Sequence, residues 1–118
     1  MCQGNIYENG WVLSIREEYM KGKFQDIISQ DKPVLVDFYA DWCGPCQMMS
    51  PVLKEVASEL GNQVSIIKVD VDRNQPIAQR FGVRSIPHLI LFKNGQIKAN
   101  KAGLMTKRDL KTMIEKEL

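Results

Sequence analysis

The sequence predicts an α/β domain in which a central mixed β-sheet of about five strands is flanked by about four helices on both faces. Segments of strand character alternate with segments of helical periodicity through the first half of the chain, and a hairpin and a helix close it. Strands that alternate with helices run parallel, whereas a hairpin pairs its strands antiparallel, so the sheet should contain both kinds of pair. A chain of 118 residues is one domain, which we place at residues 11–118 after a polar tether at residues 1–10.

Two strands and a helix are predicted before residue 40. Trp11–Ile15 is a short apolar run and is predicted as an edge strand. Glu17–Ser29 is predicted as a helix, because its apolar side chains recur at intervals of three or four residues. Pro33 then introduces Val34–Tyr39, which is apolar and β-branched and is therefore predicted as a covered strand.

A long helix is predicted to start at Pro45, which a first helical turn tolerates because the backbone N–H there has no partner. Met48 and Met49 are both expected in the core. Pro51 lacks the N–H that a helix interior uses, so a kink is expected there. The Gly61–Asn62 pair ends the helix. The apolar positions at helical spacing are Met48, Met49, Val52, Leu53, Val56 and Leu60.

The second half of the chain is predicted to hold a strand, a short helix, a hairpin and a last helix. Val64–Val71 alternates as a strand, and Pro76–Phe81 indicates the short helix. The Asn94–Gly95 pair separates two apolar segments and indicates a hairpin, because both residues tolerate positive φ. The remaining elements are the strands Leu89–Phe92 and Gln96–Lys101 and a helix from Thr106 with Leu110, Met113 and Ile114 inward.

The most informative segment is Trp42-Cys43-Gly44-Pro45-Cys46, which places two thiols at the start of a helix directly after a buried strand. The helix N-terminus favours an anion, so Cys43 is biased toward the nucleophilic thiolate. Residues three apart share a helix face, so the Cys46 sulfur can reach back and expel what Cys43 has captured. We expect Cys43 to be exposed and Cys46 to lie further inside. This arrangement predicts disulfide exchange.

The cysteine count limits the other roles of these thiols. Three cysteines cannot form a disulfide framework, because only Cys43 and Cys46 are close in the sequence. Cys2 is interpreted as an incidental exposed thiol, and the alternative is that it is the first residue of a processed, lipid-anchored protein. A zinc site needs four ligands, and the chain offers one histidine and Cys2 beyond the pair, so no metal is expected.

Charge and hydropathy exclude two further classes of protein. The net charge of +2 is small, and basic residues are scattered between acidic ones, so no nucleic-acid partner is expected. No apolar run approaches the ~20 residues of a transmembrane segment. Trp11–Ile15 is too short for the apolar region of a signal peptide.

Four segments resemble the thioredoxin family in their order and spacing. Cys-Gly-Pro-Cys alone can arise in other proteins, but the four segments together are highly specific. The resemblance extends from about Phe24 to Leu118 and implies a thioredoxin fold. The segments are V-L-V-D-F at 34–38, Y-A-D-W-C-G-P-C at 39–46, I-P at 86–87 and L-F-K-N-G at 91–95.

The resemblance also implies roles for individual residues. Cys43 corresponds to the attacking thiol and Cys46 to the resolving thiol. Asp37 corresponds to a buried carboxylate behind the pair, Lys68 to its neighbouring base, and Pro87 to a cis proline that faces the disulfide. The apolar surface that holds the substrate protein corresponds to Trp42, Gly44, Pro45, Ile86 and the Ala102-Gly103 loop.

The residues themselves leave alternatives open at three of these positions. A charged, unpaired Asp37 on a buried strand would cost several kcal/mol, so it is paired or protonated. It either carries a proton to Cys46 or belongs to a structural network. Lys68 either pairs with Asp37 or points outward. Pro87 is also compatible with a plain proline at the start of an edge strand.

Three positions depart from common choices in the family. Tyr39 is often tryptophan, Gln47 is often lysine or arginine, and His88 is often threonine. Gln47 lacks the positive charge that lysine or arginine would place near the thiols, and His88 adds an imidazole near the rim of the site. We expect His88 to be a partly buried, hydrogen-bonded histidine. These departures leave the reaction type unchanged and affect redox potential and partner choice.

The sequence thus predicts an enzyme, a thiol-disulfide oxidoreductase that reduces protein disulfides through Cys43 and Cys46 and binds no cofactor. The alternatives are an extracytoplasmic oxidase or isomerase, lipid-anchored through Cys2, and a non-catalytic protein-binding module. The resemblance implies disulfide-containing substrate proteins and a thioredoxin reductase, or another upstream electron donor, as partners. We expect a monomer in the cytoplasm, with a periplasmic or membrane-tethered protein as the alternative.

Overall fold

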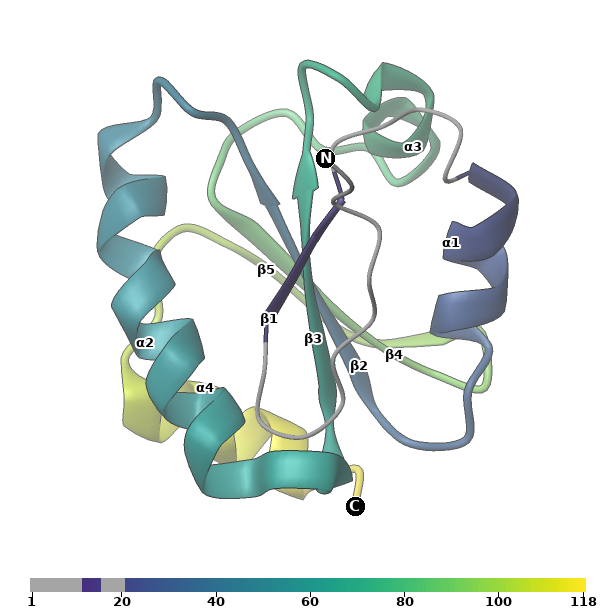
Figure 1. Ribbon diagram of the computed structural model, residues 1–118, viewed down its shortest axis with the longest axis vertical. Helices are drawn as coiled ribbons and strands as arrows, with labels where there is room; N and C mark the ends of the chain where they lie inside the picture. Colours follow the sequence, from purple (N-terminus) through teal and green to yellow (C-terminus); the bar gives the residue numbers. More distant parts are fainter. Residues whose placement is uncertain (1–11, 16–20) are drawn as a thin grey trace.

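The computed structural model describes residues 12–15 and 21–118, with side chains from residue 24 onward (Figure 1). The predicted tether, Trp11 of the predicted edge strand and residues 17–20 of the first predicted helix lie outside the described residues, so the division at residue 10 stays a prediction. The elements are β1 (Val12–Ile15), α1 (Lys21–Ile28), β2 (Val34–Tyr39), α2 (Gly44–Leu60), a 3₁₀ turn (Gly61–Gln63), β3 (Ser65–Asp70), α3 (Gln75–Arg80), β4 (His88–Lys93), β5 (Gln96–Ala102) and α4 (Lys107–Glu115).

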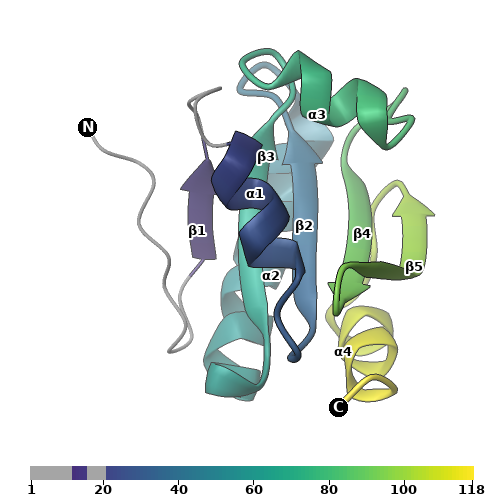
Figure 2. The ribbon, with the colours of Figure 1, turned by 90° about the vertical axis from the view of Figure 1, so that its right-hand side faces the viewer.

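The five-stranded sheet has the order β1-β3-β2-β4-β5. Strands β1, β3 and β2 pair in parallel, and β4 and β5 add antiparallel pairs, so the predicted mixed sheet is confirmed. Figure 2 shows β1 and β5 at opposite edges of the sheet. Asn94 and Gly95 take positive φ values of 55° and 78° between β4 and β5, which confirms the hairpin.

Helices cover both faces of the sheet, as predicted, with α1 and α2 on opposite sides (Figure 1). On β2, Val34, Val36 and Phe38 belong to the core beneath α1 and α3, whereas Leu35 belongs to the core beneath α2 and α4. Side chains two residues apart in a strand share a face, so Asp37 faces the α2 side. Strand β3 is buried on both faces rather than alternating, because it lies inside the sheet.

Helix α2 carries the predicted apolar stripe, with one correction. Met49 is fully buried, whereas Met48 is 65% exposed, so the expectation of a core position is wrong for Met48. Adjacent helical residues point about 100° apart around the axis, so Met48 cannot face the sheet when Met49 does. The helix runs through Pro51 without a break.

Helix α4 begins after Thr106, as predicted. The Thr106 hydroxyl accepts a hydrogen bond from the backbone N–H of Asp109 at 3.1 Å, which caps the helix. Leu110 and Ile114 are fully buried in the core beneath α2 and α4, and Met113 packs partly buried against them. The capped start of α4 fixes where the preceding loop, residues 103–106, leaves the sheet.

Candidate functional site

The two cysteines lie where β2 ends and α2 begins. Cys43 is the N-cap residue of α2, and its Sγ accepts a hydrogen bond from the backbone N–H of Cys46 at 3.1 Å. The pair forms a disulfide with the Cα atoms 5.3 Å apart. Pro45 lies in the first helical turn, as predicted. The helix N-terminus therefore stabilises negative charge on Cys43 once the disulfide is reduced.

Both cysteines are buried in the disulfide form. Cys43 is 4% exposed and Cys46 is 2% exposed, so the expected difference in exposure is absent in this form. The two cysteines form a small buried cluster with Tyr39 and Ala40, and the partly buried side chains of Val71 and Ile86 pack against this cluster.

A fully buried carboxyl group, Asp37, lies on the α2 side of the sheet. Lys68 is opposite Asp37 in the β2–β3 pairing, but its Nζ donates a hydrogen bond to Ser50 Oγ at 2.7 Å and lies 4.5 Å from the centre of the Tyr39 ring. Among the described residues, neither carboxyl oxygen of Asp37 has a hydrogen-bond partner. Burial raises the pKa of Asp37 to about 7, and the charge of Lys68 opposes this shift without cancelling it.

A small cavity of about 140 Å³ opens beside Cys46. At ~30 Å³ per molecule it has room for a few waters. Cys46 and Lys68 therefore share one polar space, and Lys68 is also the neighbour of Asp37 across the sheet. The lining residues are Tyr39, Ala40, Asp41, Cys46, Gln47, Ser50 and Lys68.

The loop before β4 lies against Cys43. The Ile86–Pro87 peptide bond is cis, and the carbonyl oxygen of Ile86 lies 3.9 Å from Cys43 Sγ. Gly103, after β5, donates its N–H to the Pro87 carbonyl at 2.8 Å. Its φ of 96° lies in the left-handed region that favours glycine. The fold thus brings Cys43, Ile86, Pro87 and Gly103 together from three separate segments.

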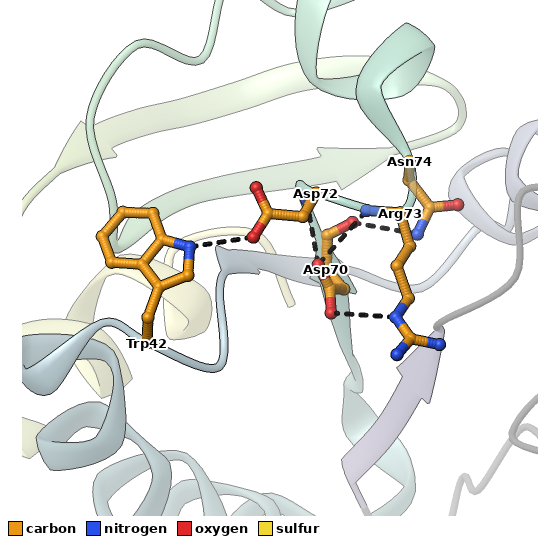
Figure 3. Close-up of polar contacts among 5 residues, drawn as sticks. All are labelled: Trp42, Asp70, Asp72, Arg73 and Asn74. Carbon is orange, nitrogen blue, oxygen red and sulfur yellow. Dashed lines mark hydrogen bonds and ion pairs between the residues drawn. The ribbon is translucent and has the colours of Figure 1, made fainter.

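Trp42 precedes the disulfide and is 71% exposed. Its indole Nε1 donates a hydrogen bond to Asp72 Oδ2 at 2.8 Å (Figure 3). Gly44 and Pro45, on the other side of Cys43, are also exposed. The hydrogen bond restrains the orientation of this exposed aromatic side chain.

The loop after β3 holds Asp72 in position (Figure 3). The buried side chain of Asp70 accepts hydrogen bonds from the backbone N–H groups of Asp72 at 2.9 Å and Arg73 at 3.3 Å, and the Asn74 side-chain amide donates to the Asp70 carbonyl at 3.0 Å. These aspartates were not predicted as site residues. The signal was available, because they lie at the carboxyl end of β3, next to the end of β2 that carries Cys43.

Two of the departures from the family pattern have defined contacts. Gln47 Nε2 donates to the Asp41 carbonyl at 3.2 Å. His88 is 9% exposed, its Nε2 contacts Asn100 Oδ1, and its ring meets the Phe38 ring edge-on. Because an amide oxygen only accepts hydrogen bonds, Nε2 carries the hydrogen. His88 is therefore hydrogen-bonded through Nε2, as expected, but it is buried, and its Nδ1 has no hydrogen-bond partner among the described residues.

Two other kinds of feature are absent from the described part of the chain. Within residues 12–15 and 21–118, no three histidine, cysteine or acidic side chains come together as a metal site. No helix within these ranges has the length and apolarity to cross a membrane.

Known proteins resemble this chain over most of its length. A family model described as "Thioredoxin" matches residues 16–116. The thioredoxin of Haemophilus influenzae is 47% identical over 92 residues, which cover 78% of this chain and 86% of that protein. The thioredoxin of Rickettsia felis is 44% identical over 94 residues, which cover 80% and 90% of the two chains.

Solved structures extend the likeness to the fold. A mutant thioredoxin from Halobacterium salinarum superposes with a TM-score of 0.83 at 37% identity, over 93% of each chain. A thioredoxin from Malassezia sympodialis superposes with a TM-score of 0.79 at 33% identity, over 91% of this chain and 94% of that one.

Family, fold and disulfide agree on one chemistry. Thioredoxins act on disulfide-containing proteins and receive their electrons from a reductase, and these relatives do not favour an oxidase, an isomerase or a non-catalytic binding module. The chain belongs to the thioredoxin family, and it is a thiol-disulfide oxidoreductase that reduces protein disulfides by dithiol-disulfide exchange through Cys43 and Cys46.

Proposed function

We propose that Cys43 is the attacking thiol of this reductase and that Cys46 is the resolving thiol. The position of Cys43 as the N-cap of α2, with its Sγ 3.1 Å from the Cys46 backbone nitrogen, carries this assignment. The N–H groups and the helix dipole favour a thiolate at that position. Cys46 lies one turn further along α2, from where its sulfur reaches Cys43.

The exchange then proceeds in two steps. The Cys43 thiolate attacks one sulfur of the substrate disulfide, a mixed disulfide forms, and the other substrate sulfur leaves as a thiolate that takes a proton from water. Cys46 loses its proton and attacks the Cys43 sulfur, which releases the second substrate thiolate and forms the Cys43–Cys46 disulfide. Two electrons pass to the substrate, and the upstream donor returns them.

Asp37 is the group that accepts the Cys46 proton. A base works best when its pKa lies near the working pH, and burial raises the pKa of Asp37 to about 7. Cys46 and Lys68 line one polar cavity, and Lys68 is the neighbour of Asp37 across the sheet. The charge of Lys68 limits the rise in this pKa and so keeps the ionised form of Asp37 accessible.

The exposed rim around Cys43 holds the substrate chain. The backbone of Ile86 pairs with an extended substrate segment, in the way that a strand adds to a sheet edge. Trp42 supplies an aromatic contact whose orientation Asp72 restrains. The rim residues are Trp42, Gly44, Pro45, Ile86, Pro87 and Gly103.

The electron donor is a flavin- and NADPH-dependent thioredoxin reductase, and the chain works as a monomer in the cytoplasm, with residues 11–118 as its domain. The family resemblance supports this part of the proposal. Outside the cytoplasm, the donor would instead be a membrane electron carrier.

Serine substitutions separate the two thiols. Cys46→Ser leaves the nucleophile in place, so it should accumulate mixed disulfides with insulin, detected by non-reducing electrophoresis. Cys43→Ser should trap no substrate and should abolish insulin reduction, measured as turbidity. Cys2→Ser is the control and should reduce insulin at the wild-type rate. Mixed disulfides on the Cys43→Ser protein would contradict the assigned order.

Asp37→Asn should change how stability depends on pH. The pKa of Asp37 rises from 3.8 to about 7 on folding, so between these pH values the folded state binds more protons and the free energy of unfolding falls as pH rises. Across the range between these two pKa values, the free energy of unfolding falls by roughly 4 kcal/mol because of Asp37. Urea unfolding should therefore show the variant gaining a few kcal/mol relative to wild type between pH 4 and pH 8. A constant difference would contradict the raised pKa.

The same substitution should slow the resolving step. An amide cannot accept the Cys46 proton, so stopped-flow reduction of a mixed disulfide at pH 7 should be at least about tenfold slower. Asp31→Asn removes an exposed carboxyl shortly before β2, outside the cavity beside Cys46, and should keep the wild-type rate. Wild-type turnover of Asp37→Asn from pH 6 to pH 8 would leave Asp37 with a structural role alone.

Asp72→Ala should free the Trp42 indole. In a Trp11→Phe background, the fluorescence anisotropy of Trp42 should fall, because its hydrogen bond to Asp72 is lost. The KM for insulin should rise roughly three- to tenfold, the value of one lost hydrogen bond. Reduction of a small aromatic disulfide should keep its rate. Unchanged anisotropy and KM would show that the bond does not position Trp42.

A further inference from the structure

Three of the exposed large apolar side chains lie on segments next to the disulfide. In the part of the chain with described side chains, five are about half exposed or more: Trp42, Met48, Ile97, Leu104 and Leu118. Trp42 precedes Cys43, Met48 lies one helical turn beyond Gly44, and Leu104 follows Gly103. Of these three, Met48 and Leu104 line one groove, and an exposed apolar groove is a candidate binding surface.

Met48 and Leu104 are opposite walls of one groove. The groove has a volume of about 280 Å³ and lies between α2 and the loop from β5 to α4. This is near the lower limit of the ~300–1,000 Å³ pockets that take whole small molecules, so it suits one or two side chains of a protein. We call it the methionine groove; its lining residues are Met48, Met49, Val52, Leu104, Met105 and Thr106.

The chemistry of the methionine groove favours an apolar occupant. Five of its six lining residues are apolar, and three are methionines, whose flexible thioethers adapt to different apolar shapes. Thr106 supplies the one polar side chain of the lining, and its hydroxyl already accepts the hydrogen bond that caps α4. A polar substrate side chain would therefore lose water in the groove and find at most the remaining positions of one hydroxyl as a partner.

The groove is continuous with the site of exchange. Leu104 is the next residue after Gly103, whose N–H binds the Pro87 carbonyl at 2.8 Å. The neighbouring carbonyl of Ile86 lies 3.9 Å from Cys43 Sγ. A substrate segment that lies along this rim to reach Cys43 is thereby led toward the groove.

Ion pairs join α4 to α2 beyond the groove. Lys107 and Lys111 of α4 bring Nζ to 2.8 Å and 2.7 Å from carboxylate oxygens of Glu59 on α2. They add modestly to the packing of α4, which follows residues 104–106, against the helix that carries Met48.

We propose that the methionine groove binds an apolar side chain of the substrate protein, leucine, methionine or phenylalanine, that flanks the reacting cysteine in an extended segment. The groove ranks disulfide substrates by that flanking residue. This inference rests on the reductase function and names the class of substrate that the reductase prefers.

The test uses disulfide-linked peptides that carry one leucine moved along the positions on either side of the cysteine, with serine at every other position. Wild-type protein should reduce the peptide with leucine at one of these positions about tenfold faster in kcat/KM than the all-serine peptide, mainly through KM. Equal kcat/KM for all peptides would overturn the groove assignment. Reduction of none of the peptides would overturn the reductase function itself.

Substitutions in and outside the methionine groove test whether the groove causes the preference for leucine. Met48→Gln combined with Leu104→Gln should abolish the leucine preference and keep the rate with the all-serine peptide, since both side chains are at least half exposed and carry little of the fold. Ile97→Gln, at a comparably exposed apolar residue of β5 outside the groove, should retain the preference. A preference that survives the double substitution would refute the proposal.

Sedimentation of the oxidised protein tests whether the methionine groove binds a second copy of the chain instead of a substrate. If the groove binds a second copy of the chain, wild type should form a dimer that the double variant loses, and that result would overturn the assignment to substrate. A wild-type monomer together with the leucine preference supports it.

Discussion

Helix α2 packs Met49, Leu53 and Val56 against the sheet with no exposed surface, and this contact determines where the other parts of the site lie. Burial of each such side chain contributes roughly 1.5–3 kcal/mol. The contact holds the N-terminus of α2 at the carboxyl end of β2, so Cys43 is fixed as its cap. The Ile86 carbonyl and the Trp42–Asp72 hydrogen bond are then arranged around a sulfur whose position the helix sets.

The same packing creates an electrostatic problem beneath the sulfurs. It buries Asp37 completely, and among the described residues no donor compensates the carboxyl group. Lys68, the nearest cation across the sheet, is engaged with Ser50 and the Tyr39 ring. Desolvation therefore outweighs the attraction of Lys68 and raises the pKa of Asp37 to about 7. The raised pKa lowers the free energy of unfolding above pH 4, and it also makes Asp37 a base that titrates near neutral pH.

Residues with strong local signals were predicted well from the sequence. The Asn94–Gly95 turn, the Thr106 cap and the Cys43 cap depend on backbone chemistry that a few residues specify, and each lies where it was expected. The position of Met48 could not be predicted in this way. Apolar side chains at helical spacing indicate a helix with a buried face, but they do not say which of two neighbours, Met48 or Met49, faces the sheet.

Features that depend on tertiary geometry were missed. Asp70 and Asp72 lie at the end of a predicted strand, which was visible in the sequence, but the register that places the end of β3 beside β2 was not. Val71 and Ile86, which pack against the cluster that contains Cys43, are distant from it in the sequence. The methionine groove needs α2 and residues 104–106 side by side, and the positions of Met48 and Leu104 in the sequence do not reveal that contact.

The balance between burial and Lys68 at Asp37 is the central claim, and nuclear magnetic resonance measures it directly. The ¹³Cγ chemical shift of Asp37 can be followed through a pH titration of the oxidised protein, in which neither sulfur titrates. One transition with a pKa of about 7 is expected, and Lys68→Met should move this pKa upward because the opposing charge is gone. A transition near the ordinary value of 3.8 would contradict the claim, because it would show that Lys68 holds Asp37 ionised.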